Sequence, residues 1–291
     1  MDKIKGHPES LGKKIQERNK KEKVWWKYTV SLVIFVIYLL PIYVLVVMSF
    51  KEKTDFSSRL LLPDYLYLDN YIKALKEGGF LNALKNTCFV TALTVGIIVI
   101  LGCMAAYPLS RNRSRLNSII KSICMGVMMI PSLSILVGVY TEIVSMNGVN
   151  CFWPVIVIGA AFGLPTAILL YSNFINSIPS SLDEAAALDG ASPFKTFWHV
   201  ILPQLKPVTA TLVIQQGVGA WNNFVYPSYF LQKPAKYTLV LLIRQYFGTA
   251  DSGSNLNGAA AVAILSTLPI VVLYIFMQKY FIQGQIDGAV K

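Results

Sequence analysis

Apolar residues dominate six long segments of the chain, and polar residues collect in the shorter segments between them. A helix needs about 20 mostly apolar residues to cross a hydrocarbon core roughly 30 Å thick. None of the six segments contains Asp, Glu, Lys or Arg, and each of those residues at a helix centre would disfavour insertion by about 2.5–3.5 kcal/mol. We therefore predict an all-α membrane protein with six transmembrane helices: Tyr28–Phe50, Asn86–Ser110, Ser122–Tyr140, Cys151–Phe174, Val208–Leu231 and Ala259–Met277.

Lysine and arginine predict the orientation of these spans, because short basic segments stay in the cytoplasm. Residues 1–23 contain eight of them, and four more bracket the second and third spans: Arg111, Arg113, Arg115 and Lys121. We therefore expect both termini to be cytoplasmic. The segment 51–85 is then assigned to the outside although it carries six Lys and Arg, since a longer segment obeys the rule less strictly.

Composition supports a single membrane domain. Hydrophobic residues make up 54% of the 291 residues and charged residues 14%, with a mean hydropathy of +0.53. We expect a basic N-terminal segment 1–27, a six-helix domain 28–282 and a C-terminal tail 283–291. The basic N-terminal segment contributes +5 of the net charge of +11 and favours contact with anionic membrane lipids. It is not expected to bind nucleic acid, because no aromatic platform accompanies the charges. The four cysteines lack metal-ligand spacing.

The stretch EAAALDGASPFKTFWHVILPQLKP, residues 184–207, is polar and rich in helix breakers between two apolar spans. Ser181 and Glu184 have the spacing of a capping box and predict a short helix that ends at Gly190. Ser192 followed by Pro193 predicts a second helix, which we expect Pro203 to end. Two short helices with a fixed bend form either a connector between spans or a projection that docks on a partner, and physical reasoning alone leaves both open.

These residues resemble a known family. Glu184–Ala186, Asp189–Ala191 and Phe197, followed by Leu202, Pro203 and Pro207, are similar to the EAA loop in permease subunits of bacterial ATP-binding-cassette (ABC) importers. The resemblance extends to NYIKAL, to AAYPLSR, to Pro131, to WNNFVYP and to the closing QKYFIQGQIDGAVK. This set covers most of the chain beyond Asp69 and resembles the carbohydrate-importing branch, which carries maltose and related oligosaccharides.

The resemblance implies a type I ABC importer permease fold, and it implies that the loop 179–207 forms coupling helices seated in a groove of a cytosolic ATPase. The residues that it assigns to this coupling surface are Glu184, Ala185, Ala186, Asp189, Gly190, Ala191, Phe197, Leu202 and Pro203. It also implies a multi-pass subunit of the bacterial cytoplasmic membrane with three kinds of partner: a second homologous permease, two cytosolic ATPase domains and an extracytoplasmic solute-binding protein.

This chain is not expected to be an enzyme or to bind a cofactor or metal. It has no Gly-rich Walker loop, so ATP and Mg are expected on the partner ATPase subunits. Its two histidines, His7 and His199, belong to no catalytic constellation.

Buried amides in the fifth span are candidates for contact with a transported solute. Burying an amide without a partner costs roughly 1–3 kcal/mol, so Gln215, Gln216, Asn222 and Asn223 must face protein, water or ligand. Trp221, Asn222 and Asn223 are our candidate substrate-pathway residues, because amides and aromatic rings suit sugar hydroxyls. Interhelical hydrogen bonding is the alternative interpretation of the same residues.

Two other transport functions stay open. A permease of this kind could carry a non-sugar solute, such as glycerol phosphate or a polyamine. An ion-coupled secondary transporter is less favoured, because it would need an ionisable or ion-binding group within the membrane, and no predicted span holds a carboxylate or a basic residue.

Overall fold

The computed structural model describes residues 8–76, 78–112, 114–248 and 253–289, and within these ranges every regular element is a helix. The α-helices are α1 Pro8–Ser49, α2 Asp69–Lys76, α3 Phe80–Arg111, α4 Arg115–Met128, α5 Leu136–Ser145, α6 Trp153–Ser177, α7 Ser181–Leu188, α8 Pro193–Thr196, α9 Lys206–Trp221, α10 Val225–Phe230, α11 Leu239–Gln245 and α12 Leu256–Ala289. The short turns η1 Ser132–Ile135, η2 Phe197–Ile201, η3 Leu202–Leu205 and η4 Pro234–Lys236 complete the order.

The core of the bundle lies between α3, α6 and α9. Among the described helices α3 and α6 share the most extensive contact. Tyr171 of α6 is fully buried there, and its hydroxyl lies 2.9 Å from the hydroxyl of Thr209 on α9. Aliphatic residues of all three helices and of the η2 and η3 turns pack around it. This core therefore holds the start of α9, and the turns that precede it, against the middle of the bundle.

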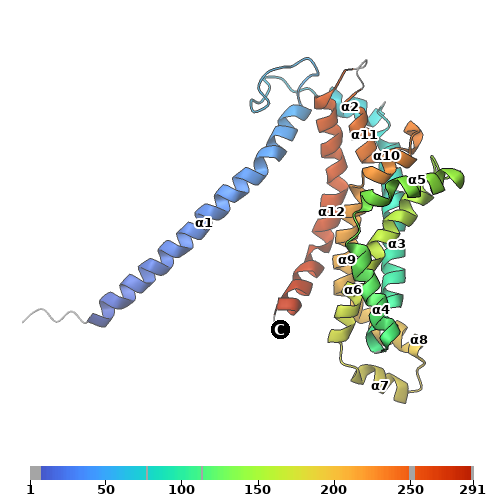
Figure 1. Ribbon diagram of the computed structural model, residues 1–291. Helices are drawn as coiled ribbons and strands as arrows, with labels where there is room; N and C mark the ends of the chain where they lie inside the picture. Colours follow the sequence, from blue (N-terminus) through green and yellow to red (C-terminus); the bar gives the residue numbers. More distant parts are fainter. Residues whose placement is uncertain (1–7, 77, 113, 249–252, 290–291) are drawn as a thin grey trace, which may run out of the picture.

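Helix α1 stands apart from the bundle along most of its length (Figure 1). Its apolar part, Trp25–Ser49, is exposed almost throughout. Its end near Ser49 is fixed: the Asn70 side chain donates to the Ser49 carbonyl at 3.0 Å and to that of Lys51 at 2.8 Å, and the Tyr71 hydroxyl donates to the Ser49 hydroxyl at 2.7 Å. The apolar surface of α1 is therefore available to lipid or to another protein.

The predicted third span, Ser122–Tyr140, is not one helix, and that expectation was wrong. Helix α4 ends at Met128, and the path from α4 to the segment Ser132–Ser145 bends by 90°. Pro131 explains the break, because proline has no amide proton and disfavours helical backbone in the residue before it. The apolar composition located the segment but indicated neither its full length nor the path of its backbone.

The predicted fifth span, Val208–Leu231, is also interrupted. Helix α9 has 16 residues and ends at Trp221, and the six-residue α10 begins only at Val225. Asn222 caps the end of α9, where its side-chain amide donates to the Val218 carbonyl at 3.0 Å. Asparagine side chains that bond to nearby backbone groups in this way favour helix ends over helix interiors.

Four described helices are each long and apolar enough to cross a membrane, and the bent α4–α5 pair makes a fifth if it counts as one span. The four segments are Trp25–Ser49, Phe80–Arg111, Trp153–Ser177 and Leu256–Phe276. The chain is therefore a helical protein with several spans. Helix α1 already begins at Pro8 and α12 continues to Ala289, so both helices extend beyond the apolar segments predicted as the first and sixth spans.

Candidate functional site: a coupling projection and a polar cavity

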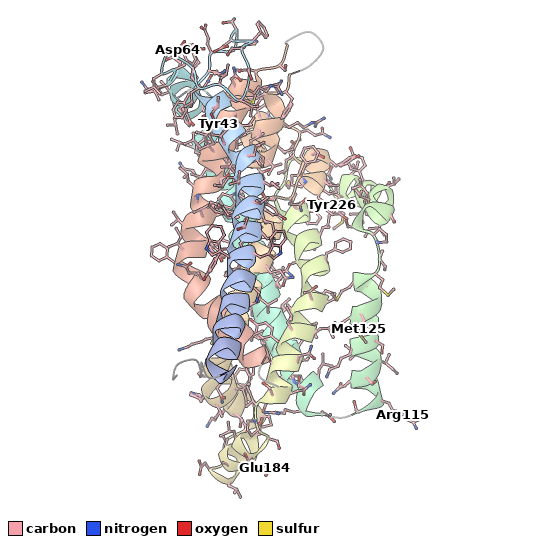
Figure 2. The ribbon with its side chains drawn as sticks, turned by 90° about the vertical axis from the view of Figure 1, so that its left-hand side faces the viewer. Tyr43, Asp64, Arg115, Met125, Glu184 and Tyr226 are labelled. Carbon is pink, nitrogen blue, oxygen red and sulfur yellow. The ribbon has the colours of Figure 1, made fainter. Side chains whose placement is uncertain are left out.

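Helices α7 and α8 project from one end of the molecule, opposite the end that carries α2 and α11 (Figure 1). Figure 2 shows Glu184 at this tip and Asp64 at the opposite end. The chain leaves α6 at Ser177, forms α7 and α8, and returns through the η2 and η3 turns to α9. The loop 179–207 predicted from the sequence is thus a folded projection of two short helices.

Helix α7 ends as predicted, at a glycine with left-handed backbone. Gly190 has φ +78°. Its amide donates to the Ala187 carbonyl at 3.0 Å, and the Ala191 amide donates to the Ala186 carbonyl at 2.9 Å. This pair of bonds is a Schellman motif, which satisfies the last carbonyls of the helix. The bend between α7 and α8 is therefore fixed by backbone hydrogen bonds and by the freedom of Gly190.

The start of α8 is also confirmed, whereas the predicted start of α7 differs. Ser192 caps α8, with its hydroxyl accepting from the Lys195 amide at 3.4 Å, and Pro193 follows it. The capping box at Ser181 is wrong, because α7 has no side-chain cap and Ser181 is already its first residue. Glu184, exposed in the first turn of α7, is therefore not used for capping.

Pro203 does not end the second helix as we expected. The chain passes from α8 through a π-helical turn, Phe197–Ile201, and a 3₁₀ turn, Leu202–Leu205, directly into α9. Shifting the hydrogen-bond register in these turns accommodates a proline without a break. Helices α8 and α9 are therefore joined by a continuous helical path.

The predicted coupling residues differ in how far they are exposed to solvent. Glu184, Ala185, Asp189, Gly190 and Pro203 are exposed, and Ala191 and Leu202 are half-buried. Ala186 and Phe197 are buried, and Phe197 packs against Tyr107 of α3 with ring centroids 5.4 Å apart. The exposed members form the outer surface of the projection, while the buried ones attach it to the bundle.

Three apolar side chains on the projection are exposed, which the sequence did not indicate. They are Leu188 at 90% exposure, Phe194 at 60% and Trp198 at 46%. Phe194 and Trp198 meet edge to face at the surface, with ring centroids 6.0 Å apart. An exposed apolar patch on a projection is typical of a protein contact surface.

An ion pair that no sequence motif indicated joins the projection to α3. Arg111 Nη2 lies 2.8 Å from Asp183 Oδ2, and the Tyr107 hydroxyl donates to Asp183 Oδ1 at 2.7 Å. Arg111 Nη1 also donates to the Ile178 carbonyl at 3.1 Å. Tyr107 and Arg111 lie on α3 and Asp183 on the first turn of α7, so we call these three residues the α3–α7 clamp.

A cavity of about 510 Å³ opens inside the bundle between α3, α6 and α9. Both interrupted spans reach it: Ser132 follows the bend after α4, and Asn222 and Asn223 lie in the break after α9. The Tyr226 hydroxyl donates to the Ser132 carbonyl at 2.7 Å and joins the two breaks. Figure 2 shows Tyr226 between the Asp64 end and Met125. At membrane depth, non-helical backbone is tolerated where it lines such a cavity.

The cavity lining combines polar, aliphatic and aromatic side chains and carries no charge among the described residues. Gln216, Asn222, Asn223, Thr94 and Thr166 lie beside the aromatic rings of Phe162, Phe224 and Tyr226. The Thr94 hydroxyl is buried and has no hydrogen-bond partner among the described residues, which is unusual unless water or a ligand supplies one. A side chain at Gly163 would bring its Cβ to 2.7 Å from Gln216 Oε1, so the glycine leaves room for that amide.

The structure separates the three predicted pathway residues. Asn222 and Asn223 line the cavity, but Trp221 does not. Trp221 is buried on the other side of α9, where its indole N–H donates to the Ser266 carbonyl of α12 at 3.2 Å. Gln216 lines the cavity, whereas Gln215 is exposed. Helical geometry explains the division, because neighbouring residues of a helix point in directions about 100° apart.

A polar cavity among membrane-spanning helices and a rigid helical projection outside them define a membrane-embedded transport subunit. The chain belongs to the family of binding-protein-dependent transport system inner membrane components, whose model matches residues 98–286. It is therefore a transport component of the inner membrane and not an enzyme.

Relatives support this family along nearly the whole chain. The melibiose/raffinose/stachyose import permease protein MelC of Bacillus subtilis (strain 168) is 37% identical over 255 residues, covering 87% of this chain and 92% of the relative. The probable starch degradation products transport system permease protein AmyC of Thermoanaerobacterium thermosulfurigenes is 34% identical, covering 90% and 94%.

The fold is that of an ABC importer permease. A crystal structure of a bacterial ABC transporter that imports the acidic polysaccharide alginate matches with a TM-score of 0.78 and 23% identity, covering 91% of this chain and 98% of that one. At this identity the likeness concerns the fold alone.

Proposed function

We propose that this chain is one of two membrane subunits of an ATP-driven importer for an uncharged sugar or oligosaccharide. The observation that carries the proposal is the cavity lining, where amides, hydroxyls and aromatic rings surround the space without a charged residue among the described ones. Amides and hydroxyls can both donate to and accept from sugar hydroxyls. The relatives named as importers of melibiose, starch products and trehalose point to the same class of solute.

The same lining argues against the charged alternatives. A polyamine would require carboxylates and a glycerol phosphate would require basic residues, because a charge taken out of water needs a partner. Ion-coupled secondary transport would also need an ionisable or ion-binding group within the membrane, and the described residues around the cavity offer no ionised side chain.

We further propose that the chain crosses the membrane six times. In this topology α4 with α5 is the third span and α9 with α10 the fifth. The projection and both termini are then cytoplasmic, in keeping with the basic residues near the α3–α4 connection and the N-terminus.

The projection is proposed to dock on a cytosolic ATPase subunit that binds ATP and Mg. Support comes from the exposed Leu188, Phe194 and Trp198, which offer apolar contact, and from Glu184, which is free to pair with a basic residue. The continuous path through the η2 and η3 turns into α9 would carry movement of the ATPase to the cavity.

Two further partners follow from the same proposal. A second permease subunit would supply the other side of the pathway and would cover part of the exposed α1 surface. An extracytoplasmic binding protein would deliver the solute at the end that carries α2 and α11. One alginate transporter of this fold has been crystallised with its periplasmic binding protein.

Uptake by cells with and without this gene tests the function. The panel would contain labelled neutral oligosaccharides, an acidic oligosaccharide, glycerol phosphate and a polyamine. We expect the deletion strain to lose ATP-dependent uptake of the neutral oligosaccharides and to keep its uptake of the charged solutes. Loss restricted to a charged solute would refute the proposal.

A further inference from the structure

A second cavity, of about 1200 Å³, lies at the end of the molecule that carries the projection. It forms where α3 ends, α4 begins and α6 runs into the loop before α7. Figure 2 places Arg115, one of its lining residues, near the level of the projection, with Met125 further along α4 toward the other end. The import function assigns no role to this cavity.

The cavity is lined by cationic and hydrogen-bonding groups. Arg111, Arg115 and Lys121 all contribute, together with asparagine and serine side chains, and none of the described lining residues is acidic. Arg111 is already paired with Asp183, whereas Arg115 and Lys121 form no ion pair with a described residue. The cavity therefore has the electrostatic character of an anion site.

An exposed apolar strip of α4 lies on the same side of the helix as Lys121. Met125 and Met128 follow Lys121 by four and seven residues, so helical geometry places the three side chains on one face, and the two methionines are exposed by 52% and 49%. Arg115 lines the cavity nearer the start of the same helix. Helix α4 thus contributes two cations to the cavity and an apolar strip that continues from Lys121 along the helix.

A basic cavity next to an exposed apolar strip fits one ligand chemistry. A phospholipid combines a phosphate with acyl chains, whereas free phosphate would use the cations and leave the apolar strip uncovered. Basic pockets between helices at the cytoplasmic surface are suited to anionic headgroups.

We propose that this cavity binds the headgroup of an anionic phospholipid, such as phosphatidylglycerol, whose acyl chains lie along the exposed strip of α4. The headgroup would lie beside Arg111, which holds the projection through Asp183. Lipid bound here would therefore stabilise the base of the coupling projection. The proposal does not depend on which solute the importer carries.

The test uses the assembled importer in detergent, with phosphatidylglycerol titrated and retained lipid counted by native mass spectrometry. The double variant Arg115→Gln/Lys121→Gln removes both unpaired cations. If each basic residue contributes about 1 kcal/mol, the affinity should fall roughly 30-fold, equivalent to about 2 kcal/mol. The matched control Lys206→Gln removes an exposed cation at the start of α9, outside the lining, and should bind like the unmodified protein.

Several outcomes would overturn the proposal. Equal loss in the Lys206→Gln control would indicate a general surface-charge effect. Stabilisation of the unmodified importer against heat by millimolar inorganic phosphate, equal to that by phosphatidylglycerol, would show a free-phosphate site. Unchanged affinity in the double variant would show that these cations bind no lipid.

A measurement on the unmodified protein keeps the test decisive if the double variant fails to assemble. A photoreactive phosphatidylglycerol analogue should crosslink to the peptide that contains residues 109–121, and excess phosphatidylglycerol should compete better than phosphatidylcholine. Crosslinks that avoid this peptide, or equal competition by both lipids, would refute the site.

Discussion

Asp183 of helix α7 and Arg111 of helix α3 form an ion pair with 2.8 Å between Oδ2 and Nη2. The same α3 carries Thr94 on the wall of the polar cavity. The clamp therefore attaches the coupling projection to a helix that lines the proposed solute pathway, in addition to the covalent path through the η2 and η3 turns.

We predict that Asp183→Asn weakens this attachment. The two side chains keep 20% and 19% exposure, so solvent screens the pair and we expect a loss of about 1–2 kcal/mol in stability. The ratio of substrate-stimulated to basal ATPase activity should fall about fivefold, equivalent to about 1 kcal/mol of coupling. Tyr107→Phe, which removes only one hydrogen bond, should show a smaller defect. An unchanged ratio in Asp183→Asn would exclude a coupling role for the clamp.

A second prediction concerns Gly190, whose φ of +78° fixes the bend between α7 and α8. Nothing lies within 4 Å of an added Cβ, so Gly190→Val would act through backbone strain of about 1–3 kcal/mol and not through a clash. Binding of the ATPase subunit to membranes that contain the variant should decrease. Gly190→Asn is the matched control, because asparagine tolerates left-handed backbone, and it should retain most of the binding. Equal ATPase binding by the two variants would argue against a role of the bend in docking.

The cavity and the buried face of α9 predict opposite results for adjacent residues. Asn222→Leu should lower sugar uptake while the importer still assembles, because it removes an amide from the cavity lining. Trp221→Ala should instead destabilise the protein, since loss of a buried aromatic side chain costs about 3–5 kcal/mol. Uptake rates and thermal unfolding of the two variants measure this difference. Normal uptake by Asn222→Leu at normal expression would remove this residue from the pathway.

The orientation can be checked with cysteines in a background without Cys88 and Cys151, which are not fully buried. Ser254→Cys should react with a membrane-impermeant thiol reagent in intact cells, because it lies in an exposed segment before α12 on the proposed outer side. Ala187→Cys, exposed on the projection, should react only after the cells are opened. Reaction of Ala187→Cys in intact cells would invert the proposed topology.

The sequence predicted the helical class, the long spans α3, α6 and α12, and the turn at Gly190 correctly. Each of these depends on local composition or on the backbone preference of one residue. The breaks after Met128 and Trp221 were missed, because hydropathy reports how apolar a segment is and not the path of its backbone. The clamp and the separation of Trp221 from Asn222 could not be found either, since both depend on which helix faces which.

Glu184 gives the last prediction, because the structure removes one role for its charge, the capping of α7, and leaves docking on the ATPase to be tested. Capping would require a side-chain hydrogen bond at the start of α7, and none is present there. Glu184→Gln should therefore change the free energy of unfolding by no more than about 0.5 kcal/mol, as is usual at an exposed position. If the carboxylate pairs with a basic residue of the ATPase, the variant should still bind that subunit less tightly, and the defect should shrink as salt increases because screening weakens the original pair. Asp189→Asn, an exposed acidic side chain at the other end of α7, is the comparison that shows whether position or net charge matters. Binding of the ATPase subunit to both variants is measured at low and at high salt. Tight binding of Glu184→Gln at low salt would leave the Glu184 charge without a docking role.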